Sequence, residues 1–132
     1  MAQLDAFGIV AGDLSRSLAF YRLLGLEFAD GAENEPHTET TLAGGVRLMF
    51  DPVSTIQSFE PGYVHTPGSA GVSLAFGCGS PEEVDSTYRM VVDAGFEGHR
   101  EPWDAFWGQR YAQLRDPDGN GVDLYAALPR SA

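Results

Sequence analysis

Large aromatic side chains are concentrated in one short segment of the sequence, residues 101–109. Both tryptophans, Trp103 and Trp107, lie in this segment, with Phe106 between them. Flat rings can stack on a flat ligand, and loops seldom carry large aromatic side chains without a packing reason. The segment is therefore predicted to be a loop that binds a planar molecule. A loop plug or a subunit interface accounts for it equally well, because tryptophan is also enriched at interfaces.

Polar side chains occupy matching positions in the last predicted strand of each half of the chain. Arg47 and Met49 alternate with apolar residues in one strand, and Asp123 and Tyr125 do so in the other. Successive side chains of a strand point to opposite faces, so each pair should share a face. Arg47 and Asp123 could form an ion pair or hold a polar ligand between them. A solvated rim would accommodate both charges as well.

Small residues alternate with large ones in the first strand of each half. The large residues should face the helices, and the small ones should face the opposite side of each sheet. Two such faces would leave a hollow that suits a ligand, although small residues can also serve close packing. The small residues are Ala6, Gly8 and Val10 in the first half and Gly71, Ser73 and Ala75 in the second.

The elements that must position these side chains are two helices and eight strands. Asp13 can cap the first helix and Gly25 can end it. Ser80 begins the second helix with a capping box, and Gly95 ends it. Residues 116–121 have the composition of a hairpin turn. The expected strands are residues 4–11, 27–29, 38–42, 46–51, 72–78, 96–100, 110–115 and 122–126.

The two halves of the chain repeat one plan of strand, helix and three strands. The sequence of residues 24–27 is similar to that of residues 94–97, and residues 45–48 are similar to residues 121–124. Such internal similarity indicates a repeated structural unit. The expected organisation is one α+β domain over residues 1–132. Module one covers about residues 1–51, a linker covers residues 52–69, and module two covers about residues 70–128.

Charge and hydropathy exclude several classes of partner. The formal net charge is -11. A chain this acidic should be repelled by phosphate backbones, so we expect no nucleic-acid partner. We see no apolar run long enough to span a membrane and no basic N-terminal region followed by an apolar run. The expected location is the cytoplasm.

Two segments carry a resemblance to a known family. Residues 13–25, with the sequence DLSRSLAFYRLLG, and residues 116–124, with the sequence DPDGNGVDL, resemble the first helix and the closing hairpin of the vicinal-oxygen-chelate superfamily. That superfamily includes glyoxalases, bleomycin-resistance proteins and extradiol dioxygenases. The resemblance implies two βαβββ modules that form a cleft. Because many members pair, it also implies a homodimer.

Further segments are similar to a drug-sequestering branch of that superfamily, the mitomycin-binding resistance proteins. This resemblance implies a metal-free protein that binds a flat natural product. The segments are residues 36–39, 44–48, 93–99 and 102–112.

The metal site of the catalytic members does not carry over to this sequence. The resemblance places their four ligands at Ala6, Arg47, Gly71 and Asp123. Alanine and glycine offer no donor, arginine repels a cation, and one carboxylate cannot hold a metal tightly. The histidines His37, His65 and His99 lie at other positions. We therefore expect no metal, no cofactor and no catalytic residue.

The sequence thus favours a protein that sequesters a small aromatic ligand, such as a planar antibiotic, without changing it. The alternative is a lyase- or dioxygenase-type enzyme of the same superfamily that acts on a small carbonyl or phenolic compound. A structural or regulatory role of the dimer is a third possibility. The expected ligand-binding residues are Trp103, Phe106, Trp107, Arg47, Met49, Tyr111, Asp123, Tyr125 and His37.

Overall fold

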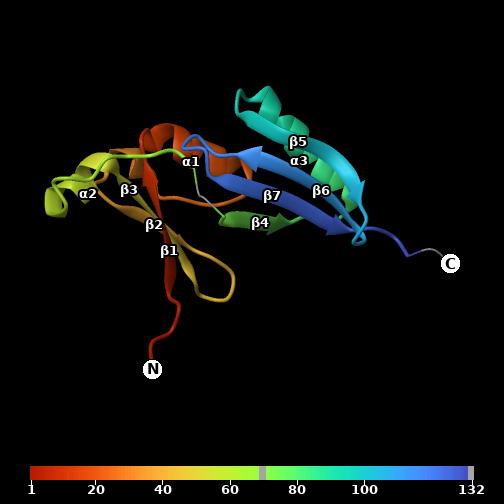
Figure 1. Ribbon diagram of the computed structural model, residues 1–132, viewed down its shortest axis with the longest axis horizontal. Helices are drawn as coiled ribbons and strands as arrows, with labels where there is room; N and C mark the ends of the chain where they lie inside the picture. The colour runs from red at the N-terminus through yellow and green to blue at the C-terminus, as the bar shows by residue number, and fades with distance from the viewer. Residues whose placement is uncertain (69–70, 131–132) are drawn as a thin grey trace. The chain divides into compact units, whose positions relative to one another are not determined.

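The chain forms two compact units, Met1–Thr66 and Pro67–Ala132, each built around one β-sheet (Figure 1). The structure is a computed structural model and describes residues 1–68 and 71–130. Helices and strands are mixed in both units, so the predicted α+β fold class is confirmed.

The first unit contains a three-stranded sheet, sheet A, with the strand order β1-β3-β2. β1 and β3 are parallel, and β2 is antiparallel to β3. Helix α1 supplies buried side chains to the core, where Tyr21 packs on Phe50 of β3 with ring centroids 5.2 Å apart. The elements are β1 (Ala6–Ala11), α1 (Leu14–Leu23), the 3-10 helix η1 (Ala32–Asn34), β2 (Thr38–Thr41), β3 (Arg47–Pro52) and α2 (Val53–Phe59).

The second unit contains a four-stranded sheet, sheet B, with the strand order β4-β7-β6-β5. β4 and β7 are parallel, and the other two pairs are antiparallel. Helix α3 packs against β5, β6 and β7, and it buries Val84 and Val91 (Figure 1). The elements are β4 (Ser73–Gly77), α3 (Pro81–Asp93), β5 (Glu97–Ala105), β6 (Gln109–Arg115) and β7 (Gly121–Ala127).

Local side-chain chemistry explains where the two long helices begin. Asp13 accepts a hydrogen bond from the Arg16 backbone N–H, and Ser80 accepts one from the Glu83 backbone N–H. Each bond satisfies one of the N–H groups that the first turn of a helix leaves without a partner. The predicted caps of both helices are therefore confirmed.

Two predictions about the elements are wrong, and the expected linker contains a helix that the sequence pattern did not indicate. Residues 27–29 form no strand, so the first unit has one strand fewer than the second. The expected linker, residues 52–69, contains helix α2. The aromatic segment is not a loop but the end of the β5–β6 hairpin, whose turn is residues 106–108.

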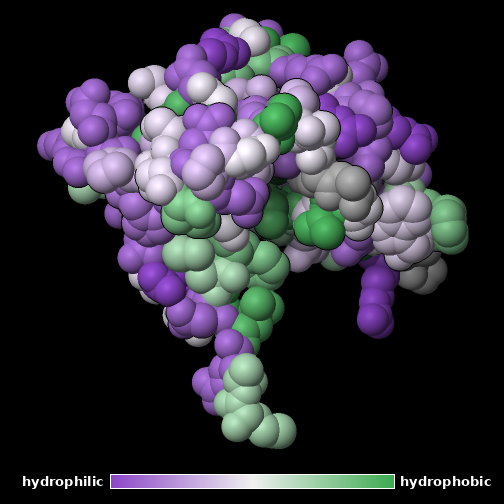
Figure 2. All heavy atoms as spheres, turned by 60° about the vertical axis from the view of Figure 1, so that its left-hand side comes forward, coloured by the Kyte–Doolittle hydropathy of each residue, from purple (hydrophilic) through white to green (hydrophobic). Residues whose placement is uncertain are grey.

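Hydrophilic residues predominate on the surface that Figure 2 displays, with smaller apolar groups between them. This distribution agrees with the net charge of -11. Within the described part of the chain, no helix has both the length and the apolar character that crossing a membrane requires.

Candidate functional site

The two faces of sheet B differ in their side chains. One face lies under α3 and carries the buried residues Ala112, Leu114, Val122 and Leu124. Because side chains alternate along a strand, the residues between them belong to the opposite face, which we call the open face of sheet B. Ser73, Ala75 and Gly77 of β4 lie on this face and are exposed.

The register of the strands arranges the open face in three rows. An aromatic row is joined to a polar row, and the polar row is followed by a third row with a charged edge. The aromatic row is Trp103, Tyr111, Tyr125 and Gly77; the polar row is Arg100, Gln113, Asp123 and Ala75; the third row is Glu97, Arg115, Gly121 and Ser73.

A hollow of about 590 Å³ lies over the polar and third rows. Such a volume falls within the range of pockets that hold small ligands. Side chains line one part of the hollow, and glycines line the rest, which leaves backbone close to any occupant. Its lining includes Ser73, His99, Gln113, Arg115 and Asp123, together with Gly68, Gly71, Gly119 and Gly121.

The aromatic row ends in a cluster of rings that meet edge to face. The Tyr111 ring centroid lies 5.5 Å from that of Trp103 and 5.3 Å from that of Trp107. Phe106 adds a further edge-to-face contact with Trp107, at 5.0 Å. Trp107 is 48% exposed and Phe106 is 96% exposed. The cluster therefore fixes its rings against one another and still presents aromatic surface to a ligand.

A hydrogen bond holds the Trp107 indole, and a glycine makes room for the Tyr125 ring. The Trp107 indole N–H donates to Gln109 Oε1 at 2.8 Å, so the ring is oriented by its own hairpin. Tyr125 lies over Gly77, where a Cβ atom would come within 3.2 Å of the phenol oxygen. The missing side chain at Gly77 thus allows the Tyr125 ring to lie flat against β4.

The centre of the polar row is a carboxylate held by two hydroxyl groups. The Tyr111 hydroxyl donates to Asp123 Oδ2 at 2.6 Å, and the Ser73 hydroxyl donates to the same oxygen at 3.4 Å. Asp123 is only 8% exposed. Burial, and then the hydrogen bond to Asp123, raises the pKa of Tyr111 to about 12. The phenol therefore stays protonated near neutral pH and can donate to the carboxylate, which lines the hollow.

Sequence reasoning missed several polar residues of the open face. Arg100 and His99 reach it because β5 contains irregularities in its pairing with β6, between Gly98 and Arg100 and between Arg100 and Trp103. The Arg100 guanidinium lies 3.6 Å above the Trp103 ring. The Arg115 guanidinium lies 3.2 Å from His99 Nε2. Simple alternation cannot reveal these positions, because an extra residue in a strand reverses the faces of those that follow.

The remaining predicted residues, His37, Arg47 and Met49, belong to the first unit. Arg47 lies between two carboxylates, 2.6 Å from Asp5 Oδ2 and 2.5 Å from Glu39 Oε2. The hydrogen bond that Arg47 donates to Asp5 is the largest cause that raises the pKa of Arg47. Both carboxylates belong to the same unit as Arg47, so Arg47 has two structural partners that the sequence did not indicate.

Met49 and His37 have separate surroundings in the first unit. Met49 pairs in register with Gly8, and its terminal methyl would lie 3.9 Å from a Cβ atom at that glycine. His37 Nδ1 is 2.6 Å from Asp51 Oδ1. Their role in binding a ligand stays a prediction.

The donor set does not fit the metal that catalytic members of the resembled superfamily bind. Among the described residues, no three His, Cys, Asp or Glu side chains lie together in a way that could hold a metal ion. Gly71 precedes β4 rather than lying in it, and the group of β4 that contacts Asp123 is the Ser73 hydroxyl. Asp123 is held by hydroxyl donors and Arg47 is a cation, so neither completes a metal site.

A second hollow, of about 330 Å³, lies between α3 and the far side of β5 and β6. Two charged residues of its lining, Arg110 and Asp85, form an ion pair with each other. Tyr88 is the aromatic residue of its lining. It offers less aromatic surface than the open face of sheet B, which we regard as the candidate site.

Comparison with known proteins identifies relatives by family and by fold. The family model described as "Glyoxalase/Bleomycin resistance protein/Dioxygenase superfamily" matches residues 3–124. No curated protein matches the chain in sequence.

Several solved structures share the fold. A glyoxalase-related enzyme from Fulvimarina pelagi has a TM-score of 0.80 at 21% identity, over 96% of this chain and 88% of its own. A hypothetical protein from S. aureus has a TM-score of 0.78 at 23% identity, over 96% and 95%. A glyoxalase/bleomycin resistance protein/dioxygenase family enzyme from Burkholderia phytofirmans has a TM-score of 0.75 at 19% identity, over 96% and 100%. At these identities the likeness shows the fold alone.

Proposed function

Since the chain belongs to the glyoxalase/bleomycin resistance protein/dioxygenase superfamily, we propose that it is a metal-independent protein that binds a planar aromatic small molecule on the open face of sheet B. The ligand is of the natural-product or antibiotic kind that the mitomycin-binding resistance proteins sequester. A role in drug resistance follows from sequestration alone, because a bound drug is removed from its target.

One observation carries this proposal: an aromatic row lies directly beside a polar row whose Gln113 and Asp123 line a hollow. The Trp107 ring offers exposed surface for stacking, whereas Arg100 covers one face of the Trp103 ring. Beyond the rings, Gln113 and Asp123 line the hollow. An apolar surface beside a few placed polar groups provides affinity and orientation separately.

Binding without chemistry is favoured over catalysis by the state of the polar groups. Asp123 is the buried carboxylate of the face, and Tyr111 and Ser73 already donate to it. A general base must reach the proton that it removes, and this carboxylate is engaged by its own neighbours. The raised pKa of Tyr111 likewise keeps its phenol from acting as a base near neutral pH.

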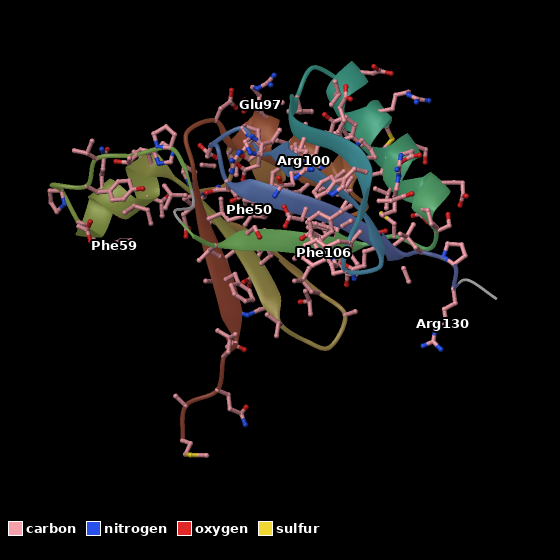
Figure 3. All side chains as sticks on the ribbon, turned by 45° about the vertical axis from the view of Figure 1, so that its right-hand side comes forward. Phe50, Phe59, Glu97, Arg100, Phe106 and Arg130 are labelled. Atoms are coloured by element: carbon pink, nitrogen blue, oxygen red, sulfur yellow. The ribbon has the colours of Figure 1, made fainter. Side chains whose placement is uncertain are left out.

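The test is a calorimetric titration of the protein with a 1,4-naphthoquinone in the presence of a metal chelator. We expect saturable binding, with quenching of tryptophan fluorescence. Trp107→Ala should raise Kd at least about tenfold, because it removes a stacking contact and its buried area; tenfold corresponds to about 1.4 kcal/mol. Phe59→Ala is the matched control, since Phe59 is an exposed aromatic residue of α2, in the other unit (Figure 3).

Two results would contradict the proposal. A folded Trp107→Ala variant that binds the quinone as tightly as the parent would exclude stacking on this ring. Binding that appears only after zinc, nickel or iron is added would favour the alternative, a metal-dependent enzyme. Mass spectrometry of the recovered quinone separates sequestration, which leaves it unchanged, from turnover.

A further inference from the structure

The open face of sheet B carries two arginines, Arg100 and Arg115, in a strongly acidic chain. The chain has 8 basic residues against 19 acidic ones. Three of its arginines form ion pairs: Arg22 with Glu33, Arg47 with Asp5, and Arg110 with Asp85. Arg100 and Arg115 differ from these. Among residues 1–68 and 71–130, neither forms an ion pair: the Arg100 guanidinium lies over the Trp103 ring, and the Arg115 guanidinium lies beside His99.

We propose that the ligand of this site carries a carboxylate, which Arg100 binds at the border between the aromatic and polar rows and Arg115 attracts from the third row. This inference rests on the proposed function, and it adds the charge of the ligand.

The placement of Arg100 supports the proposal. Its guanidinium lies 3.6 Å above the Trp103 ring, so the ring restrains its plane. A stacked guanidinium keeps its edge N–H groups available, and their fork matches the two oxygens of a carboxylate. A restrained donor also loses little side-chain freedom when it binds.

The spacing of the rows sets where the carboxylate would lie. Residues two apart on a strand are roughly 6.6–6.8 Å apart. A ligand ring stacked on Trp107 beside Tyr111 would therefore direct a substituent toward the next row, which holds Arg100 and Gln113. Gln113 adds an amide N–H donor in the same row, directly opposite Arg100 in the β5–β6 register.

The negative groups of the face do not oppose this arrangement. Asp123 is buried, and it accepts hydrogen bonds from Tyr111 and Ser73. Two hydroxyl donors therefore balance part of its charge, and Asp123 also lines the hollow. Glu97 lies in the third row of β5, one row farther than Arg100 from the aromatic row, and neither residue lines the hollow.

The experiment compares two ligands that differ in charge but not in ring system: anthraquinone-2-carboxylate and its neutral carboxamide. We expect the parent protein to bind the carboxylate at least about tenfold more tightly, which corresponds to about 1.4 kcal/mol. Arg100→Gln should remove most of this preference and leave the affinity for the carboxamide nearly unchanged. Arg115→Gln should reduce the preference by a smaller factor.

Arg130→Gln is the matched control. Arg130 is exposed, it follows β7, and it lies away from Arg100 (Figure 3). The variant changes the net charge by the same amount as Arg100→Gln, and it should leave the preference intact. An equal loss in both variants would show a general charge effect and would overturn the inference.

The outcomes separate this inference from the proposed function. If both ligands bind the parent equally well, the charge inference is wrong and the proposed function stands. If neither ligand nor the naphthoquinone binds, the proposed function itself fails. A preference that survives Arg100→Gln would assign the carboxylate to another group and would also overturn the inference.

Discussion

At the scale of single residues, the contact between Tyr111 and Asp123 determines the character of the candidate site. The hydroxyl-to-carboxylate distance of 2.6 Å is that of a strong, charge-assisted hydrogen bond. The bond has two consequences for a ligand. It fixes the Tyr111 ring at the centre of the aromatic cluster, and it engages the Oδ2 atom of the Asp123 carboxylate.

The pKa of Tyr111, raised to about 12, predicts a pH-dependent contribution to stability. The folded state binds the proton more tightly than the unfolded state, whose tyrosines have a pKa of about 10. The contribution is therefore fully present below pH 10, and it is lost as the pH rises from about 10 to 12. The difference in free energy of unfolding between the parent and Tyr111→Phe should shrink across that range.

The same pKa can be read directly from the tyrosine ring carbons by NMR. The signal assigned to Tyr111 should titrate near pH 12 in the parent, and Asp123→Asn should lower that value, because the amide is a weaker acceptor. Titration of Tyr111 near pH 10 in the parent protein would show that the hydrogen bond to Asp123 does not form.

The sequence pattern indicated the rings and the carboxylate that the structure places on the open face of sheet B, but not the cations of that face; their role in binding a ligand stays a prediction. Trp103, Tyr111 and Tyr125 were visible as aromatic residues at alternating or clustered positions, and the structure places them in one row. Arg100 was not visible, because its face depends on where the irregularities of β5 fall. The irregularities arise from the pairing of β5 with β6, which no local sequence pattern specifies.

At the scale of elements, the β6–β7 turn holds the two strands that contribute most to the open face. Asp116 Oδ1 accepts the backbone N–H groups of Asp118 and Asn120, at 2.9 and 2.8 Å, and Oδ2 accepts the Asn120 side-chain amide. Asp116 is only 3% exposed. One carboxylate thus satisfies donors that the turn would otherwise leave buried.

Asp116→Ala should lower the free energy of unfolding by at least about 2 kcal/mol, because it leaves buried donors without an acceptor. Urea denaturation measures the change. Asp30→Ala, at an exposed carboxylate, serves as the control and should change stability by less than about 0.5 kcal/mol. Equal stability of the two variants would show that the turn does not depend on the Asp116 carboxylate.

Elements with strong local signals were predictable, and those that depend on distant partners were not. Caps and glycines define the ends of α1 and α3 within the sequence itself. Residues 27–29 read as a strand, but Phe28 packs edge to face on Phe50, and the Ala29 carbonyl accepts a hydrogen bond from Arg22. These side-chain contacts replace a strand ladder.

Helix α2, in contrast, is an element that forms although the sequence pattern does not predict it. It has no side-chain cap, no acidic residue in its first turn and no buried residue. Its contacts are with β3 and β1, so the rest of the first unit supports it. Tertiary support of this kind leaves little trace in a local pattern.

At the scale of the whole molecule, we propose that ligand binding takes place on one surface of the second unit. The chain matches its superfamily over residues 3–124, and the fold is shared with structures that cover nearly all of it. Fold alone does not define a ligand, because unrelated functions occur on one fold. The homodimer stays a prediction.

The most direct test of that assignment is a nuclear magnetic resonance titration of the metal-free protein with the naphthoquinone. We expect the largest shifts at the indole N–H groups of Trp103 and Trp107 and at the side-chain amide of Gln113, with smaller changes around Tyr88 in the second hollow. Shifts confined to the surroundings of Tyr88 and Arg89 or to the first unit, or no shifts at all, would contradict binding at the open face of sheet B.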